Sequence, residues 1–395
     1  MYRLRTLCGS MPCEGHGNSI QQRQSPGLIQ DAKYSVIKST NIIIKRLNPK
    51  NKSVIVALSG GVDSALAAHD LLQAGWHTEA FFLNILPEGL SGTDLLAAKS
   101  VAKHLGIRFH CLNEAEKFEN EVISYFRKSY NMGLTPNPCV ICNNRIKVVV
   151  GLSLADSLGI NYLATGHYAR TKRLSNGQAG LLKAKDLKKD QSYFLHQIQK
   201  GAIPRLILPL GDRTKKDIMK WAAETGIFPL VQRESQEICF LKGNYRTFLE
   251  KRGLLNNLPG DIVTVDGKLL GRHAGLYAYT VGQRQGIGIP DKTPYYVVAL
   301  DRKNNRLVVG KEHSLWGKEL LVEHVNWLVS PDMAFKQPCT VKIRYGHAGG
   351  RADLELLASG KVRVCFFPDQ WAITPGQFAV FYLDDLVLGG GSICG

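Results

Sequence analysis

The chain has 395 residues, of which 44% are hydrophobic, so it can bury the cores of two or three domains. Its formal net charge of +17 favours an anionic partner such as nucleic acid, because basic side chains release counterions from phosphates; the alternative is a basic chain that is merely soluble. No run of 18 or more residues is apolar, so no membrane partner is expected. Nine cysteines without a secretory signal argue against a disulfide framework and favour a reducing cytoplasm.

Residues 1–50 differ from the rest in their scarcity of acidic side chains, and we expect a variable N-terminal extension there. Such a segment is compatible with an organelle transit peptide, a disordered extension or a misassigned start. Cys8 and Cys13 lie in this stretch without partners in sequence, and we expect them to be incidental.

A candidate phosphate-binding loop follows. Val54–Leu58 is typical of a buried strand, Ser59–Gly61 of a tight turn, and the next segment of a helix. Glycines allow a close backbone approach, and the helix N-terminus attracts anions. The Walker lysine is absent; instead Asp63 is a candidate Mg²⁺ ligand, with Ser64 beside it. A purely structural turn is the alternative. The string SGGVDS resembles the pyrophosphate loop of N-type ATP pyrophosphatases, which adenylate a substrate oxygen.

Strands and helices alternate over residues 52–233, which predicts a doubly wound parallel α/β sheet. The strand at 79–84 should end near the nucleotide, so Leu83 either flanks the adenine or belongs to the core. The strand that begins at 161 ends at a glycine turn, and we expect His167 there to contact substrate, with general base and structural histidine as alternatives. Further expected features are a helix at 94–105, a strand at 107–112 containing a buried Cys111, and a helix at 214–225.

Residues 135–147 combine two prolines with a C-x-x-C pair. The prolines favour an extended entry into a helix. A thiol near that helix N-terminus, beside Arg145 and Lys147, should have a lowered pKa and act as a nucleophile. The alternatives for the C-x-x-C pair are half of a structural zinc site and a redox dithiol. A zinc site would need a second pair of cysteines at matching spacing, and none is present. Only Cys239, which we expect in an accessible loop, could complete a three-thiol site.

The remaining motifs suit nucleic acid. The lysine-rich run 183–189 leads into an aromatic pair at 193–194, a mixture that grips a nucleotide backbone, although a charge run is usually a solvated face. Residues 261–270 predict a hairpin with an Asp-Gly turn, and 279–288 form a glycine-rich basic loop. From about 306 to 395, short alternating strands predict a small β-barrel.

Together these motifs resemble the tRNA-specific 2-thiouridylases over nearly all of residues 52–395. The segments that carry the resemblance are SGGVDS at 59–64, TPNPCVICN at 135–143, ATGHYAR at 164–170, KDQSYFL at 189–195, EICF at 237–240, YTVGQRQGIG at 279–288 and the terminal PGQ and GGG. The resemblance implies an N-type ATP pyrophosphatase domain over 51–235, a central tRNA-binding domain over 236–308 and a C-terminal β-barrel over 309–395.

The resemblance also implies a mechanism: ATP adenylates the C2 oxygen of the wobble uridine in tRNA, and sulfur follows from a cysteine persulfide supplied by a cysteine-desulfurase relay. Cys239 would carry the persulfide, Cys142 would be the nucleophile, and a disulfide between the two is an implied end state. The tRNAs implied are lysine, glutamate and glutamine acceptors. The implied ATP-binding residues are Ala57, Leu58, Ser59, Gly60, Gly61, Val62, Asp63, Ser64, Leu83 and Gly166. The implied tRNA-binding residues are His167, Lys189, Asp190, Gln191, Arg344, Tyr345 and Gln377.

One departure from the family pattern concerns Cys139, which stands where many members carry aspartate. The acid/base role of that carboxylate is therefore in doubt, and an iron–sulfur cluster on Cys139, Cys142 and Cys239 becomes an alternative. We expect the persulfide route. Two rival functions are a different adenylating synthetase or amidotransferase, which would not need the distant thiols, and a non-catalytic RNA-binding protein, which would not need SGGVDS.

Overall fold

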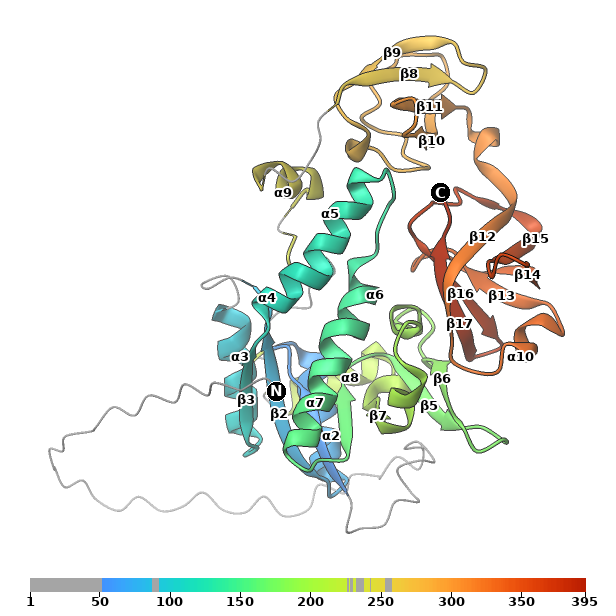
Figure 1. The fold of residues 1–395 in the computed structure, drawn as a ribbon. Helices are drawn as coiled ribbons and strands as arrows, with labels where there is room; N and C mark the ends of the chain where they lie inside the picture. Colours follow the sequence, from blue (N-terminus) through green and yellow to red (C-terminus); the bar gives the residue numbers. More distant parts are fainter. Residues whose placement is uncertain are drawn as a thin grey trace, which may run out of the picture. The chain divides into compact units, whose positions relative to one another are not determined.

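The computed structural model describes residues 52–86, 92–225, 227, 230–231, 238–241, 243–252 and 258–395 (Figure 1). The expectations for residues 1–50, including Cys8 and Cys13, lie outside this part of the chain. The strands up to residue 207 are β1 (Ser53–Ala57), β2 (His77–Asn84), β3 (Phe109–Asn113), β4 (Tyr162–Thr165), β5 (Ala169–Arg173), β6 (Ala179–Lys183) and β7 (Leu206–Ile207). The helices are α2 (Val62–Gln73), α3 (Gly92–His104), α4 (Ala115–Phe118), α5 (Ser124–Asn131), α6 (Pro138–Cys142), α7 (Val149–Ser157), α8 (Lys215–Glu224), α9 (Tyr245–Lys251) and α10 (Asp332–Phe335).

Five of these strands form the parallel sheet that the alternating pattern predicts, in the order β3-β2-β1-β4-β7. Alternate residues of β1 face opposite sides: Val54 and Val56 belong to the core under α2, α3 and α8, whereas Ile55 belongs to the core under α5, α6 and α7. Helices therefore cover both faces, and the doubly wound fold is confirmed. The strand order reverses between β1 and β4, the place where such sheets bind ligands.

The prediction for Cys111 is wrong. β3 is the edge strand of the sheet, and its alternation leaves the Cys111 side chain exposed. A short apolar stretch in sequence does not show whether both faces of its strand are covered, which explains the error.

Helices α6 and α7 are joined by a π-helical turn at Asn143–Val148 into one helix from residue 138 to 157. By length and hydropathy this is the one described helix that could cross a membrane, although half of its apolar window is buried inside the protein. Gly151 shows the packing directly, because a Cβ there would lie 2.8 Å from the Leu163 side chain of β4 and 2.9 Å from Phe81 of β2. The helix thus covers the parallel sheet.

The central part of the chain forms a four-stranded sheet in the order β10-β11-β8-β9. Its strands are β8 (Gly260–Thr264), β9 (Leu269–His273), β10 (Tyr296–Asp301) and β11 (Arg306–Gly310). The predicted hairpin is present between β8 and β9, with Gly267 at a φ of 84° that favours glycine. Because β11 pairs with β8 and β10, it belongs to this sheet and not to the barrel that follows.

The C-terminal strands close into the predicted β-barrel of six strands, in the order β12-β15-β14-β13-β16-β17, with β12 pairing back to β17 (Figure 1). Its strands are β12 (Trp316–Trp327), β13 (Cys339–Lys342), β14 (Gly350–Leu356), β15 (Val362–Trp371), β16 (Phe378–Leu383) and β17 (Leu386–Ile393). The hairpin β5–β6 of the N-terminal part joins the same sheet, because Leu182 of β6 pairs with Leu386 of β17. This pairing ties the barrel to the segment that follows β6.

Candidate active site

The loop between β1 and α2 is organised by two serine hydroxyls. Ser64 donates to the Gly61 carbonyl at 2.9 Å and accepts the Ser59 backbone N–H at 3.1 Å. The Ser59 hydroxyl accepts the Gly61 N–H at 3.4 Å. Gly61 caps α2 without a side-chain hydrogen bond, so the N–H groups of the first helical turn face the loop. This is the geometry of an anion site.

Two glycines bring neighbouring backbones close to this loop. Gly60 has a φ of 80°, and a Cβ there would lie 2.7 Å from the Asp94 carbonyl oxygen. A Cβ on Gly166, which follows β4, would lie 2.9 Å from the Ser64 backbone nitrogen and 3.0 Å from the Asp63 carbonyl carbon. Neither position has room for a larger residue, so Gly166 lies against the start of α2, and its contact with the nucleotide stays a prediction.

The other predicted nucleotide residues gather at the same edge of the sheet. Ala57 ends β1, and the Leu58 N–H donates to the Phe81 carbonyl of β2 at 2.9 Å. Val62 is buried at the first position of α2. Leu83, near the end of β2, is half-buried and packs on the hydrophobic core, so the core interpretation holds and adenine contact stays a prediction.

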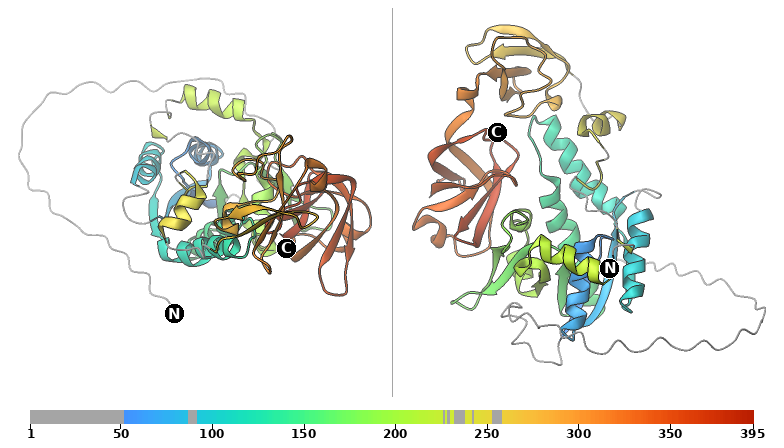
Figure 2. Two further views of the ribbon diagram at one scale, coloured as in Figure 1. Left: turned by 90° about the horizontal axis from the view of Figure 1, so that it is seen from above. Right: turned by 180° about the vertical axis from the view of Figure 1, so that it is seen from behind.

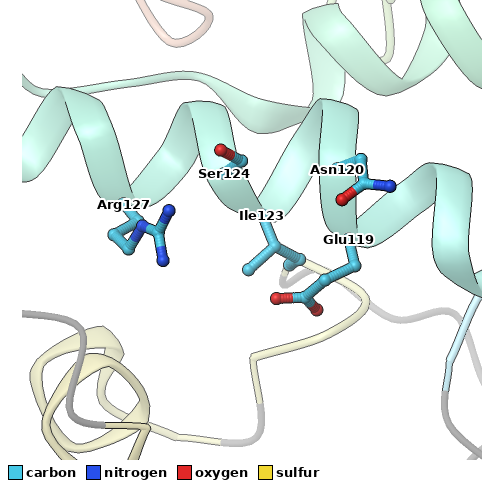
Figure 3. Close-up of a pocket in the computed structure, with 5 residues that line it drawn as sticks. All are labelled: Glu119, Asn120, Ile123, Ser124 and Arg127. Atoms are coloured by element: carbon cyan, nitrogen blue, oxygen red, sulfur yellow. The ribbon is translucent and has the colours of Figure 1, made fainter.

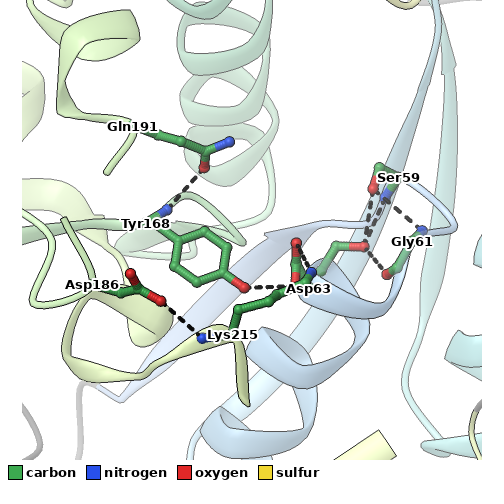
Figure 4. A network of polar contacts seen from close by, with 8 residues as sticks. Ser59, Gly61, Asp63, Tyr168, Asp186, Gln191 and Lys215 are labelled. Atoms are coloured by element: carbon green, nitrogen blue, oxygen red, sulfur yellow. Dashed lines mark hydrogen bonds and ion pairs between the residues drawn. The ribbon is translucent and has the colours of Figure 1, made fainter. Parts of the chain in front are cut away.

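Asp63 is engaged by two groups that sequence reasoning did not select (Figure 4). The Lys215 ammonium lies 2.8 Å and 3.0 Å from its two carboxylate oxygens, and the Tyr168 hydroxyl donates to one of them at 2.9 Å. The Asp63 carboxylate thus already has a cation partner in this structure, and a Mg²⁺ ion on Asp63 stays a prediction. The T-x-x-D string at 214–217 is a capping signal, and it predicts that a helix begins at Lys215. This is the one sequence signal that marks the position of Lys215.

The thiols of the C-x-x-C motif lie in the first turns of the long helix, but their predicted pKa shift is wrong. Burial raises the pKa of Cys139 to about 11 and that of Cys142 to about 12, and it also raises the pKa of Cys239, although Cys239 lies in an exposed turn. The charge of Lys147 opposes each of these rises. Desolvation outweighs the helix N-terminus, and sequence alone does not show how deeply a short motif is buried.

Lys147 reaches the thiols because of the π-helical turn. In a regular α-helix a residue five positions after Cys142 points to another face, whereas the wider turn at Asn143–Val148 brings it back. Arg145, which we also expected to act on the thiols, is exposed and pairs with Glu121 at 2.6 Å. Among the described residues, Lys147 is therefore the cation whose charge acts on all three thiols.

The seven cysteines within the described residues are all free thiols. Among the described residues no group of three His, Cys, Asp or Glu side chains lies close enough to hold a metal ion. In this structure the thiols of Cys139, Cys142 and Cys239 are not gathered around a common metal position, and no disulfide joins Cys142 to Cys239; the persulfide and cluster routes both stay predictions.

His167 lies directly after Gly166 and is half-buried. Burial, reinforced by the charge of Lys147, lowers its pKa well below the usual range. One ring nitrogen pairs with the Thr165 hydroxyl at 2.8 Å. His167 is thus a neutral group next to Gly166 and the SGGVDS loop, able to form hydrogen bonds but not to neutralise a phosphate.

Gln377 of the barrel holds the entry to the thiol helix. Its amide nitrogen donates to the carbonyl oxygens of Thr135 at 2.9 Å and Pro136 at 3.4 Å. The Thr135 N–H donates to the Pro375 carbonyl at 2.9 Å, and a Cβ on Gly376 would lie 2.8 Å from the Thr135 nitrogen. In this structure Gln377 positions the C-x-x-C segment; contact with tRNA stays a prediction.

The predicted tRNA residues at 189–191 divide between the surface and the interior. Asp190 is buried, and its carboxylate accepts bonds from the Ala184 N–H, the Ser192 N–H and the Ser192 hydroxyl. Its carboxylate therefore shapes the loop, and contact of Asp190 with tRNA stays a prediction. The Gln191 side-chain oxygen accepts a hydrogen bond from the Tyr168 N–H at 2.9 Å. Lys189 is half-buried.

A pocket of about 400 Å³ joins this loop to the barrel. The lysines Lys183, Lys188 and Lys342 contribute positive charge to it, and Tyr345 contributes an aromatic ring. The remaining lining residues are Leu187, Asp190, Gly346, His347 and Ala348. The Tyr345 ring packs on Phe194 with a centroid distance of 4.4 Å, whereas the Arg344 guanidinium is turned to the Trp371 carbonyl at 3.2 Å. The pocket thus brings together residues 183–190 and 342–348, two segments that are far apart in sequence, and their contact with tRNA stays a prediction.

A smaller hollow lies along α5 and the π-helical turn before it (Glu119–Ile123), lined by Glu119, Asn120, Ile123, Ser124 and Arg127 (Figure 3). Glu119 pairs with Arg252 at 2.8 Å. None of the predicted site residues lines it.

Comparisons with known proteins agree with this layout. The chain matches three consecutive family models, described as the tRNA methyl transferase HUP domain over residues 52–243, the tRNA methyl transferase PRC-barrel domain over 246–311 and the aminomethyltransferase beta-barrel domain over 317–393. It is 39% identical to the tRNA-specific 2-thiouridylase MnmA of Halothermothrix orenii, covering 86% of this chain and 98% of that one. It is 41% identical to the enzyme of the same name from Pelobacter propionicus, covering 86% and 97%.

The chain belongs to the tRNA-specific 2-thiouridylase family. The family models are described as methyl transferases, but the relatives matched over almost their whole length are named thiouridylases. Among solved structures, a 4-thiouridine synthetase–RNA complex with bound ATP aligns with a TM-score of 0.36 at 18% identity, covering 52% of this chain and 50% of that one. That likeness is too distant to carry an argument about the 2-thiouridylase site.

Proposed function

We propose that this family member is an ATP-dependent tRNA-uridine 2-sulfurtransferase that adenylates the C2 oxygen of the wobble uridine and then replaces that oxygen with sulfur. The observation that carries the proposal is the convergence of three features around β4. The SGGVDS loop packs against Gly166. The charge of Lys147 lowers the pKa of His167 and opposes the rise in the pKa of Cys142. The side chain of Gln191 accepts a hydrogen bond from the Tyr168 N–H.

The first step uses the anion site at the start of α2. The uridine C2 oxygen attacks the α-phosphorus of ATP, the bond to the bridging oxygen of the β-phosphate breaks, and pyrophosphate leaves with that electron pair. The N–H groups of the loop and the helix dipole stabilise the charge on the leaving group. Adenylation converts the C2 oxygen into part of an AMP leaving group.

The second step uses the thiols. The terminal sulfur of a persulfide on Cys239 attacks C2, and AMP leaves with the former C2 oxygen. The Cys142 thiolate then attacks the Cys239 sulfur, the S–S bond to the transferred sulfur breaks, and its electron pair stays with the 2-thiouridine. The products are thiolated tRNA and a Cys142–Cys239 disulfide, which a thiol reductant must reduce before the next turnover.

Because the pKa values of these thiols are high, a nearby cation is needed to stabilise their thiolate forms, and we assign this role to Lys147. A thiol with a pKa of about 12 is protonated at neutral pH, yet only the thiolate is the nucleophile. The charge of Lys147 favours the thiolate at each cysteine. Burial raises the pKa of Cys139 to about 11, so the thiol is protonated at neutral pH and does not serve as the carboxylate base that aspartate would be. We assign it a supporting position next to Cys142.

The basic pocket between Lys188 and Tyr345 supports tRNA as the polyanionic substrate, since lysines and an exposed aromatic ring suit phosphates and bases. Lysine, glutamate and glutamine acceptors, a cysteine-desulfurase relay and a reducing cytoplasm remain predictions of the resemblance.

The test compares Cys142→Ser, Cys239→Ser and Cys139→Ala with Cys111→Ser, an exposed thiol on the edge strand. With transcribed tRNA, ATP and a persulfide donor, we expect the first two variants to release AMP and pyrophosphate without forming 2-thiouridine, and Cys111→Ser to behave as wild type. Iron and sulfide are measured on each anaerobic sample. Thiolation that tracks bound iron and disappears in Cys139→Ala would replace the persulfide route with a cluster.

A further inference from the structure

The ion pair between Lys215 and Asp63 joins two segments that are 152 residues apart in sequence. The Lys215 ammonium contacts both carboxylate oxygens, and the side chains are only 18% and 22% exposed. Such a pair is better ordered and less screened by solvent than an ordinary surface ion pair. Its place is notable, because Asp63 belongs to the first turn of the helix that forms the anion site.

Lys215 is fixed in position by its own helix. Thr214 and Asp217 form a reciprocal capping box, with the Asp217 N–H donating to the Thr214 hydroxyl at 3.2 Å and the Thr214 N–H donating to the Asp217 carboxylate at 3.0 Å. The Lys215 N–H donates to Asp186 at 3.1 Å (Figure 4). These bonds hold the backbone, whereas the long side chain of Lys215 remains able to change partners.

We propose that Lys215 is a phosphate-binding residue of the ATP site, which rests on Asp63 before ATP binds and then moves its ammonium to the β- and γ-phosphates. The loop lacks the lysine of a Walker motif, so its own side chains supply no cation to the nucleotide. Lys215 supplies that charge from another helix. Packing of α8 beside α2 keeps the ammonium within reach of the loop (Figure 2).

The Asp63 carboxylate keeps a hydrogen-bond donor after the Lys215 ammonium has moved. When Lys215 moves to the phosphates, Asp63 keeps the Tyr168 hydroxyl at 2.9 Å. During adenylation negative charge grows on the leaving pyrophosphate, and a positioned ammonium stabilises it there. The inference rests on the proposed use of ATP and assigns to that reaction a residue outside the SGGVDS loop.

The test measures the binding of ATP, pyrophosphate and AMP to full-length Lys215→Ala, with Lys216→Ala as the matched control. Lys216 is the next residue of α8, carries the same charge and is exposed. Since AMP lacks β- and γ-phosphates, we expect Lys215→Ala to weaken ATP and pyrophosphate about tenfold or more while AMP changes less than about twofold. Lys216→Ala should leave all three unchanged.

Equal weakening of all three ligands, or no weakening of any, would overturn the assignment and leave Lys215 as a structural partner of Asp63. Lys215→Met, which keeps most of the apolar stem, replaces the alanine variant if the latter does not fold, and circular dichroism decides which is used. Thiolation by the wild type is assayed in parallel. Absence of ATP-dependent product there contradicts the proposed function itself, whereas normal product with unchanged phosphate binding in the variants contradicts only the role of Lys215.

Discussion

Tyr168 and Gln191 bond to each other twice: the Tyr168 N–H donates to the Gln191 side-chain oxygen at 2.9 Å, and the Gln191 N–H donates to the Tyr168 carbonyl at 2.7 Å. The Tyr168 hydroxyl meanwhile donates to Asp63 at 2.9 Å. One buried residue thus connects the loop that we assign to ATP with the segment that we assign to tRNA (Figure 4).

The first prediction distinguishes the hydroxyl of Tyr168, which bonds to Asp63, from its backbone, which bonds to Gln191. Tyr168→Phe removes the hydroxyl bond to Asp63 but keeps both bonds to Gln191, which use the backbone of residue 168. We expect a loss of about 1 kcal/mol in the free energy of unfolding and a rise of a few-fold in the KM for ATP, with unchanged tRNA affinity. Urea denaturation, steady-state kinetics and filter binding measure the three quantities. A matching loss of tRNA affinity would show that the hydroxyl serves both sites.

The second prediction concerns pH. Because the folded-state pKa of Cys142 is about 12, the thiolate fraction at Cys142 should rise about tenfold per pH unit between pH 7 and 9, and the single-turnover rate of sulfur transfer should rise with it. Lys147→Met removes the charge that lowers this pKa, so the rate at pH 8 should fall several-fold while its slope against pH stays the same. Rapid-quench measurement of 2-thiouridine tests both statements.

Arg145→Met is the matched control for Lys147→Met, because it removes an equal charge from the same helix at an exposed position. We expect its pH profile to follow that of the wild type. Lys147→Arg should restore part of the rate. A rate that is flat between pH 7 and 9 in the wild type would mean that another group, and not the thiol proton, limits sulfur transfer.

The same thiols predict how stability depends on pH. A thiol whose pKa is higher in the folded state than in the unfolded chain holds its proton more tightly when folded. Its contribution is therefore complete below about pH 8.5, the unfolded value, and is lost as pH rises toward the folded pKa of about 12 for Cys142. Denaturant titrations at pH 8 and 10 should show a smaller decrease for Cys142→Ser than for wild type; equal decreases would contradict the burial of this thiol.

The basic pocket predicts the salt dependence of tRNA binding. Each lysine that contacts a phosphate adds about 0.7 to 0.9 to the slope of log affinity against log salt. We expect Lys188→Ala to reduce the slope by about that amount and to weaken binding of all tRNAs similarly. Lys220→Ala, on an exposed face of α8 outside the pocket, should leave the slope unchanged. Equal effects of the two variants would show that binding follows total charge and not this pocket.

Two glycines allow a test of the nucleotide loop. Gly60 and Gly75 both have a positive φ, 80° and 75°, but only Gly60 is crowded, with the Asp94 carbonyl 2.7 Å from the place of a Cβ. Gly75→Ala should therefore cost only the backbone preference, about 1 kcal/mol, and keep ATP affinity. Gly60→Ala should cost more and abolish measurable ATP binding, as followed by urea denaturation and calorimetry. Preserved ATP affinity in Gly60→Ala would contradict the placement of the phosphates on this loop.

Local patterns sufficed to predict the parallel sheet, the SGGVDS loop and the barrel, because each is encoded by short-range periodicity and turn residues. Contacts between distant segments could not be predicted in this way. Lys215 reaches Asp63 only after α8 has packed beside α2, and the π-helical turn that aligns Lys147 with Cys142 has no signal in composition. The direction of the thiol pKa shifts was wrong because burial, a tertiary property, dominates it.

The most direct test of the account is the analysis of transcribed tRNA after incubation with the purified protein, ATP and a persulfide donor. Nucleoside mass spectrometry should find 2-thiouridine at the wobble position, with one AMP and one pyrophosphate released for each sulfur added, and none of these products in the absence of tRNA. Sulfur incorporation without ATP, or AMP release with no sulfur in the tRNA of the wild type, would contradict the assignment of this chain as an adenylating 2-thiouridylase.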